Sequence, residues 1–286
     1  MGESDEIRAQ LEALAQPERA EVMRRYLRTG PGQYGEGDVL LGVPVPGSRR
    51  VARAHRDLAH ARVIELLGDS VHEVRLVALV IWTERCRHAS TPSAERERIL
   101  GDYLDHSDRV NNWDLVDLSA PTIVGRRLLE TGRGIALLRE LAGSSLLWDR
   151  RIAIVSTMPF SRGGDPGPAL EIATLLLGDG HDLIHKATGW MLREAGKADE
   201  QALVGFITEH AAEMPRTALR YAIERLSEDQ RASLMALHPP ASGQPGSGRP
   251  AARTAAEAPS GSRADLRAGV RSRSAAPSAA SLRRVR

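Results

Sequence analysis

The segment WDRRIAIVSTM at residues 148–158 recurs in weakly similar form along the chain and indicates its fold. The related segments are HEVRLVALVIW (72–82), RVNNWDLVDLS (109–119), LIHKATGWMLR (183–193) and MPRTALRYAIE (214–224). Steps of 37, 39, 35 and 30 residues separate the aligned positions Arg75, Asn112, Arg151, Lys186 and Arg216. Such steps are near the length of a HEAT or armadillo unit, which is built from antiparallel helices. The pattern predicts an all-α fold, an α-α superhelix (solenoid) of HEAT-like helix pairs.

Helical periodicity also covers the sequence between these segments, and turn residues such as SRGGDPGP (161–168) separate the helices. Stacked helix pairs would place the five aligned residues on one curved face. A row of cations on that face suits an extended anionic ligand or a protein partner. We expect helices at 3–15, 17–28, 48–58, 60–67, 71–87, 93–104, 108–118, 121–130, 133–142, 145–158, 167–177, 181–194, 199–211, 215–225 and 227–237.

The composition agrees with a helical protein. Of the 286 residues, 42% are hydrophobic but only 3% are aromatic, which disfavours a β-sandwich or β-barrel. Cys86 is the single cysteine, so neither an intrachain disulfide nor a cysteine-based zinc site is expected. No apolar run approaches the roughly 18 residues of a membrane helix. The N-terminus is charged and lacks the apolar core of a signal peptide. We therefore expect a cytoplasmic protein without a membrane partner.

The charge is distributed unevenly along the chain. Residues 239–286 contain nine Arg but only two acids, Glu257 and Asp265, so this segment has a net charge of +7. Because the total is +2, residues 1–238 have a net charge of −5. The C-terminal segment is rich in Pro, Gly, Ser and Ala, so we expect a disordered tail at 239–286 after a folded domain at 1–238. Such a tail either attracts nucleic acid nonspecifically or is a solubilising extension.

An aspartate interrupts an apolar helix face in NNWDLVD (111–117). Trp113 and Asp117 lie four residues apart, so they share one face of a helix with Val116. A carboxylate on an apolar face is costly unless it is paired. Asp117 is therefore either a functional group or a structural one that caps or pairs with a neighbouring helix.

An arginine pair interrupts the next apolar face, in LLWDRRIAIV (146–155). Arg151 falls in the same row as Leu147 and Ile154, and Arg150 lies about 100° away around the helix. Arginine binds a carboxylate or a phosphate with two hydrogen bonds. Arg151 is thus a candidate ligand of an anionic substrate. The alternatives are an arginine that reaches solvent from the core edge and an internal pair with Asp117.

The segment HKATGWMLRE (185–194) combines a tryptophan with cations. The helical period places Trp190 beside Lys186 and Arg193 and outside the core face. This position suits a flat, charged ligand such as a nucleotide, or a cation against the indole ring. Alternatively, Trp190 covers the edge of the repeat. The expected core face consists of Ile184, Ala187/Thr188, Met191 and Ala195.

A glycine-rich stretch, RRYLRTGPGQYGEGD (24–38), contains the spacing GxGxxG at Gly30, Gly32 and Gly35. The residues before it are helical and polar rather than a buried strand, so we predict a loop and no dinucleotide site. Tyr26, at the end of the preceding helix, is either a ligand contact or a packing residue.

Together these segments resemble the DNA alkylation repair family of HEAT-like repeat glycosylases, the AlkD-like enzymes. The resemblance covers about residues 5–235 and rests on an ordered set of motifs. It implies release of cationic alkylpurines, of the 3-methyladenine and 7-methylguanine type, from double-stranded DNA without base flipping, and neither a metal ion nor an organic cofactor. The motifs are RYLRTGPGQYGEGD (25–38), LLGVPVP (40–46), WDLVD (113–117), LWDRR followed by IAI (147–154), and KATGW followed by MLRE (186–194).

The resemblance also implies roles for individual residues. Asp117 matches the catalytic aspartate of the family, Trp113 and Trp190 match its lesion-facing tryptophans, and Arg151 rather than Arg150 matches its arginine. In the implied mechanism the Asp117 carboxylate stabilises a sugar that becomes positively charged. This mechanism expects that no internal partner neutralises Asp117. We expect a monomer, associated with the bacterial nucleoid when bound to DNA, whose DNA contacts include Tyr26, Arg150, Lys186, Arg193 and Arg216.

Two other functions are open at this point. One is a HEAT-type protein-binding scaffold, which the negative charge of residues 1–238 favours and which predicts that Asp117 and Trp190 are packed or paired. The other is a structure-specific DNA binder without excision activity. The presence of Trp113, Asp117, Arg151 and Trp190 together favours the enzyme.

Overall fold

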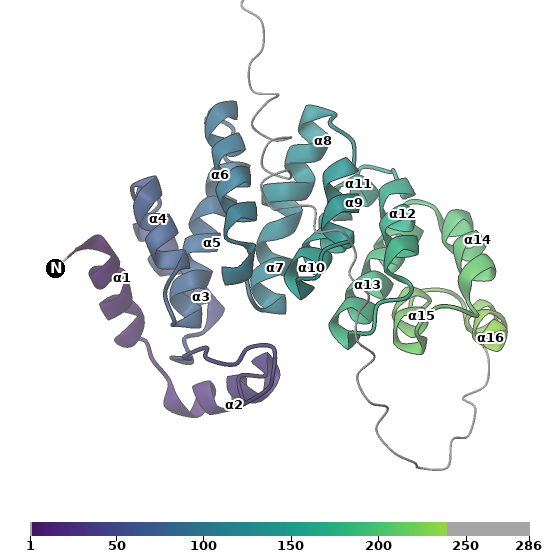
Figure 1. Cartoon of the computed structure of the whole chain (residues 1–286), viewed down its shortest axis with the longest axis horizontal. Helices are drawn as coiled ribbons and strands as arrows, with labels where there is room; N and C mark the ends of the chain where they lie inside the picture. Colours follow the sequence, from purple (N-terminus) through teal and green to yellow (C-terminus); the bar gives the residue numbers. More distant parts are fainter. Residues whose placement is uncertain (1, 239–286) are drawn as a thin grey trace, which may run out of the picture. The chain divides into compact units, whose positions relative to one another are not determined.

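The computed structural model describes residues 2–238, and the predicted disordered tail at 239–286 lies outside these described residues. The described chain has the predicted all-α superhelical fold (Figure 1). Within it, no helix is long and apolar enough to cross a membrane. The α-helices are α1 (Glu3–Glu12), α2 (Pro17–Leu27), α3 (Val45–Ala54), α4 (His60–Leu67), α5 (His72–Arg87), α6 (Ser93–Asp105), α7 (Trp113–Ala120), α8 (Arg127–Thr131), α9 (Ala136–Ala142), α10 (Leu147–Val155), α11 (Met158–Arg162), α12 (Gly167–Leu176), α13 (Asp182–Ala198), α14 (Glu200–His210), α15 (Arg216–Ala222) and α16 (Glu228–Leu237).

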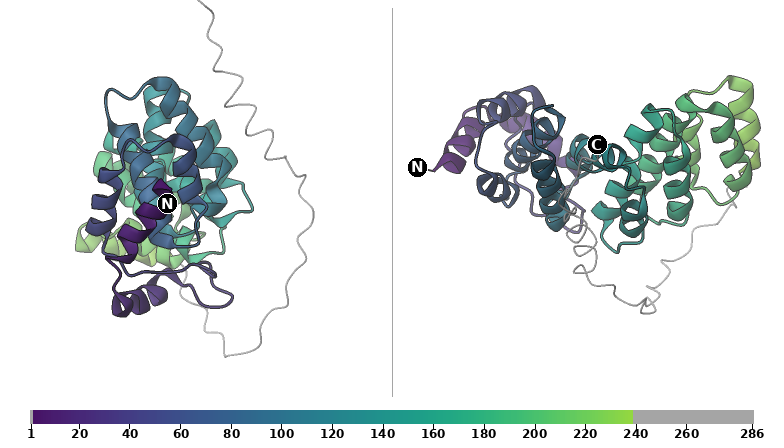
Figure 2. Two further views of the ribbon diagram at one scale, coloured as in Figure 1. Left: turned by 90° about the vertical axis from the view of Figure 1, so that its left-hand side faces the viewer. Right: turned by 90° about the horizontal axis from the view of Figure 1, so that it is seen from above.

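Five helices form a continuous row through the stack. Helix α5 packs against α7, α7 against α10, α10 against α13, and α13 against α15. We call these five helices the helix row. Each of the five recurring segments contributes to one of its helices, so the repeat found in the sequence corresponds to a repeat in space. Helices α4, α9, α12 and α14 pack against members of the row, and Figure 2 shows the succession of helices from two further directions.

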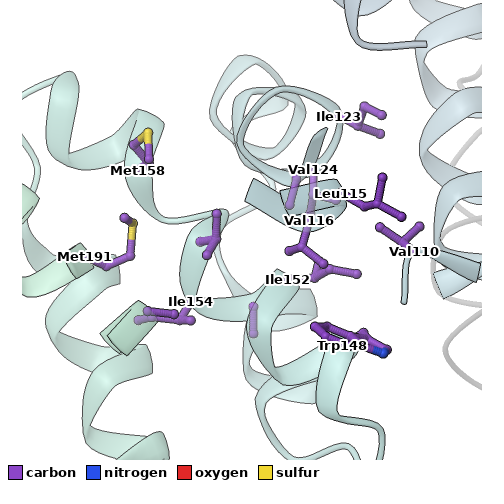
Figure 3. Packing of buried hydrophobic residues seen from close by; sticks show 14 of the residues in the cluster. Val110, Leu115, Val116, Ile123, Val124, Trp148, Ile152, Ile154, Met158 and Met191 are labelled. Carbon is purple, nitrogen blue, oxygen red and sulfur yellow. The ribbon is translucent and has the colours of Figure 1, made fainter. Parts of the chain in front are cut away.

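Apolar faces of the helix row build a shared core. Leu115, Val116 and Ile152 are fully buried, and Figure 3 shows them between α7 and α10. Trp148 lies beside Ile152 at the start of α10, and Met191 of α13 continues the cluster on the other side. Because neighbouring helices share this core, each helix of the row fixes the position of the next.

Two predicted helices are interrupted in the structure. The helix expected at 108–118 is a short 3-10 turn (Ser107–Arg109) followed by α7, because Asn112 caps α7 by accepting a hydrogen bond from the N–H of Trp113 at 2.9 Å. The helix expected at 145–158 ends at Val155, and α11 begins afterwards with Pro159 in its first turn. The break before α7 places Trp113 in the first turn of a row helix.

Candidate functional site

Asp117 and Arg151 form a bidentate ion pair between adjacent helices of the row. Nε of Arg151 donates to Oδ1 of Asp117 at 2.9 Å, and Nη2 donates to Oδ2 at 2.8 Å. The third nitrogen, Nη1, donates to the carbonyl oxygen of Leu183 at 2.6 Å. Arg151 therefore ties α7 and α10 to the first turn of α13.

Burial distinguishes the two partners. The side chain of Arg151 is 5% exposed, whereas that of Asp117 is 18% exposed. Burial raises the pKa of Asp117 above its usual value, because the loss of hydration outweighs the effect of the Arg151 guanidinium. The Asp117 side chain is thus largely dehydrated but keeps some contact with solvent.

This pair corrects two expectations from the sequence. Asp117 does have an internal partner, so the expectation of an unneutralised carboxylate is wrong. Arg151 is not positioned to bind a phosphate, because each of its three guanidinium nitrogens already donates to a protein oxygen. The alternative interpretation, an internal pair with Asp117, describes the structure. Its physical reason is that a carboxylate on an apolar helix face is costly without a partner.

Arg150 also has a structural role, contrary to its expected contact with DNA. Its Nε donates to Oδ2 of Asp179 at 2.6 Å, and its Nη1 donates to the carbonyl oxygens of Ser144 and Ser145 at 3.0 Å each. The residue joins the turn before α10 to the turn before α13. Neither member of the arginine pair presents a free guanidinium.

The expected row of cations on one face is likewise wrong. Arg75 is buried and pairs with Asp38, and Asn112 is buried as the cap of α7. Of the five aligned positions, only Lys186 and Arg216 reach solvent. The aligned polar residues mostly connect neighbouring elements instead of facing a ligand, because the packing of the row encloses them.

Lys186 and Arg193, the two cations expected beside Trp190, take different partners on and near α13. Nζ of Lys186 lies 2.7 Å from Oδ2 of Asp182, but the lysine side chain is 42% exposed. Arg193 pairs with Glu224 beyond α15. Lys186 thus reaches solvent, while Arg193 is held by an acidic side chain.

The two tryptophans lie at the edge of the core. Trp113 and Trp190 are both half-buried and pack against it, and Trp113 also contacts the small cluster of α2. The predicted core face of α13 is confirmed, since Ile184, Ala187, Thr188, Met191 and Ala195 are buried. Beside Trp190, a Cβ atom at Gly189 would lie 2.4 Å from the carbonyl oxygen of Ala218, so glycine is required where α13 and α15 meet. Close packing against α15 therefore fixes the backbone of α13 next to Trp190.

A buried network that the sequence analysis missed joins the N-terminal region to α5 and α7. His72 contacts Asp114 through Nε2 at 2.8 Å and Asp38 through Nδ1 at 3.5 Å, and Nη2 of Arg75 lies 2.7 Å from Oδ1 of Asp38. The two carboxylates raise the pKa of His72 to about 9, although burial opposes them. We call these four residues the N-terminal network. The available signal in the sequence was the presence of His72 and Arg75 in the largely apolar stretch HEVRLVALV (72–80).

Two tyrosines of the N-terminal region differ in their surroundings. Tyr26, the predicted contact, is 70% exposed. Tyr34, which the sequence analysis did not select, has its ring 5.7 Å from that of Trp148 and 6.2 Å from that of His181, in edge arrangements. The sequence did contain a signal for Tyr34. It is an aromatic residue between glycines in a polar loop, where no apolar helix face requires it.

A basic cavity lies beside the end of α2. Its volume is about 570 Å³. Arg25 and Arg28 are exposed there and have no acidic partner within residues 2–238, whereas Arg24 pairs with Glu21. These two arginines are free cations outside the helix row. The cavity is lined by Arg24, Arg25, Arg28, Thr29, Gly30, Gln33 and Asp38.

Comparisons with known proteins agree with this architecture. The sequence model of a family described as "DNA alkylation repair enzyme" matches residues 7–226. A solved structure from Enterococcus faecalis, described as a predicted DNA alkylation repair enzyme, is similar with a TM-score of 0.60 and 16% identity, covering 75% of this chain and 97% of that chain. At this identity the likeness concerns the fold. A search of curated proteins finds no match.

Proposed function

Because the chain belongs to the DNA alkylation repair enzyme family, we propose that it is a DNA glycosylase that releases cationic alkylpurines from duplex DNA. The substrates would be of the 3-methyladenine and 7-methylguanine type. The observation that carries the proposal is Asp117, whose carboxylate is fixed by the bidentate pair with Arg151 between α7 and α10 while its side chain stays 18% exposed.

The geometry supports stabilisation of a positive sugar by an ion-paired carboxylate. A carboxylate has about four lone-pair sites, and a bidentate arginine uses two of them. The free edge of Asp117 would face the C1′ atom as the bond to the purine breaks and positive charge develops. Arg151 acts here as a positioning residue, because it fixes the carboxylate without contacting the substrate. It also weakens the negative potential, so the free edge must lie close to the sugar.

The chemistry of the lesion removes the need for a general acid. An N-alkylated purine already carries a positive charge, so it leaves as a neutral base when the C1′–N bond breaks. The electron pair of that bond stays with the purine, and water then adds to the sugar cation and loses a proton to the solvent. Trp113 and Trp190 would hold the cationic lesion and the deoxyribose against their rings, with the base still in the helix.

The DNA backbone would be held by the cations that remain exposed. Arg25 and Arg28 line the basic cavity, and Lys186 and Arg216 lie at the starts of α13 and α15. Phosphate contacts give affinity that depends on salt but not on sequence. These four side chains, rather than Arg150 and Arg151, would contact the phosphates.

Asp117→Asn tests the proposal directly. The variant should lower the release of 7-methylguanine from methylated duplex DNA by about 100-fold or more, because it removes the charge that stabilises the transition state. Free purine is measured by mass spectrometry, and DNA affinity by fluorescence anisotropy should persist. Asp114→Asn is the matched control, since it removes a carboxylate from the same helix that pairs with His72 instead. Unchanged release by Asp117→Asn would remove this residue from the mechanism.

A DNA binder without excision is the second candidate. The observation that favours it is the bidentate pair itself, because Arg151 compensates the charge of Asp117. The same pairing is what the scaffold alternative predicted, although family membership favours DNA. DNA binding without purine release by the unmodified protein would establish the binder, and absence of both would favour the scaffold.

A further inference from the structure

Residues 28–41, which we call the strap, cross the starts of consecutive helices of the row. Val39 forms a bridge with Val71 just before α5, in which the N–H of His72 donates to the carbonyl oxygen of Val39 at 2.9 Å. Close to the start of α7, Nδ2 of Asn111 donates to Oδ1 of Asp38 at 3.1 Å. The strap thus runs along the edge of the row where α5 and α7 begin.

Tyr34 extends the strap to the next two helices. Its ring meets Trp148 in the first turn of α10 and His181, the N-cap of α13. Trp148 precedes Arg151 by three residues, so the two share one face of α10. His181 also accepts a hydrogen bond from the N–H of Leu183, whose carbonyl oxygen binds Arg151. Through Trp148 and His181, the ring therefore lies near the part of α10 and α13 that holds Arg151.

The strap holds Tyr34 in place by contacts on both sides. The Tyr34 hydroxyl donates to the carbonyl oxygen of Tyr26 at 3.2 Å. A Cβ atom at Gly35 would lie 2.5 Å from the carbonyl oxygen of Leu27, so the chain turns there only with glycine. At the end of the strap the buried carboxylate of Glu73 accepts hydrogen bonds from the backbone N–H groups of Leu41, Gly42 and Val43. A side chain held in this way behaves as a fixed wall.

On the basis of the proposed function, we propose that Tyr34 limits the size of the alkyl group that the site accepts. A surface of stacked helices is open and imposes no such limit by itself. The ring of Tyr34 fills space against Trp148 and His181, the two neighbours of the Arg151 anchor, and is only partly exposed. The cations of Arg28, Lys186 and Arg151 act electrostatically on its hydroxyl, against the weaker effect of Asp114. This charge does not attract a cationic purine, so the contribution of Tyr34 to selectivity is steric.

The experiment compares two lesions of equal charge and different size. Duplex DNA containing 3-methyladenine or 3-benzyladenine, whose alkyl groups lie in the minor groove with the C1′ atom, is incubated with the full chain and with Tyr34→Ala, Tyr34→Phe and Tyr34→Trp. The unmodified protein should release the methyl adduct at least about tenfold faster, because steric exclusion is worth that much in a fixed site. Tyr34→Ala should reduce this preference to about threefold or less. Tyr34→Phe should retain the preference and Tyr34→Trp should increase it.

The ratio of the two rates separates size selection from a purely structural role. A structural role of Tyr34 would slow both releases equally in Tyr34→Ala and leave the ratio unchanged. An unchanged ratio, or equal release of both adducts by the unmodified protein, would overturn the inference while the glycosylase activity stands. Release of neither adduct by the unmodified protein would overturn the proposed function, and this inference with it.

Discussion

The N-terminal network and the Asp117–Arg151 pair each connect a helix of the row to another element by an ion pair. Arg75 and Arg151 occupy aligned positions of the repeat, and each binds a carboxylate from an earlier part of the chain. In the N-terminal network the side chains of Arg75 and Asp38 are 1% and 4% exposed, while that of Asp114, which contacts His72, is 25% exposed. In the second pair the side chain of Arg151 is 5% exposed and that of Asp117 is 18% exposed.

The comparison of Arg75 with Arg151 shows how one repeated position can serve structure in one place and chemistry in another. The Arg75–Asp38 pair mainly connects elements, because it is almost fully enclosed, and its desolvation makes the loss of one partner costly. A pair whose acid is partly exposed still contributes a connection, but it also offers a fixed negative charge to a ligand. Between these two aligned arginine pairs, the exposure of the acid differs and the identity of the arginine does not.

Removal of Arg75 should have the largest effect on stability. Arg75→Ala leaves the carboxylate of Asp38 buried with a weaker partner and should lower the free energy of unfolding by about 3–5 kcal/mol. Urea denaturation followed by circular dichroism measures this change. Arg216→Ala, at an exposed aligned position, is the control and should leave the unfolding midpoint nearly unchanged. A loss below about 1 kcal/mol for Arg75→Ala would mean that the enclosed network is not a structural connection.

The pH dependence of stability should report the same network. Because the pKa of His72 is about 9 in the folded protein and lower when unfolded, protonated His72 stabilises the fold below about pH 6.5. This contribution, about 3 kcal/mol, should be lost as the pH rises through 9. Urea unfolding at several pH values measures it, and His72→Gln should flatten the profile in this range. A profile of the unmodified protein that is flat between pH 7 and 9 would contradict a charged His72.

Salt dependence of DNA binding should show the smallest effect and separate exposed from enclosed arginines. Arg25→Ala and Arg28→Ala should each reduce the slope of log affinity against log salt by about 0.9, because each removes one phosphate contact. Arg151→Ala should leave the slope unchanged, since its guanidinium faces protein oxygens. Anisotropy titrations between low and high salt measure the slope. A reduced slope for Arg151→Ala alone would mean that Arg151, and not Arg25 or Arg28, contacts a phosphate.

Part of the site could be anticipated from local sequence and part could not. The period of the apolar residues predicted the core face of α13 and left Trp190 outside it. The cost of a carboxylate on an apolar face predicted that Asp117 needs a partner. The pair of Arg151 with Asp117 was only one of several alternatives, because Arg150 and Arg151 are adjacent and their acceptors, Asp179 in the turn before α13 and Asp117 in α7, are distant in sequence. Tyr34 was missed because its neighbours are distant in sequence.

The sequence by itself determined the helical fold and its family. Helical periodicity and the recurring segments are local patterns, and the motifs that mark the family occur in a fixed order along the chain. The tertiary structure alone decided which charged side chains reach solvent. Ion pairs between residues far apart in sequence depend on how the helices stack, and stacking enclosed the Arg75–Asp38 pair while leaving the Asp117 side chain partly exposed.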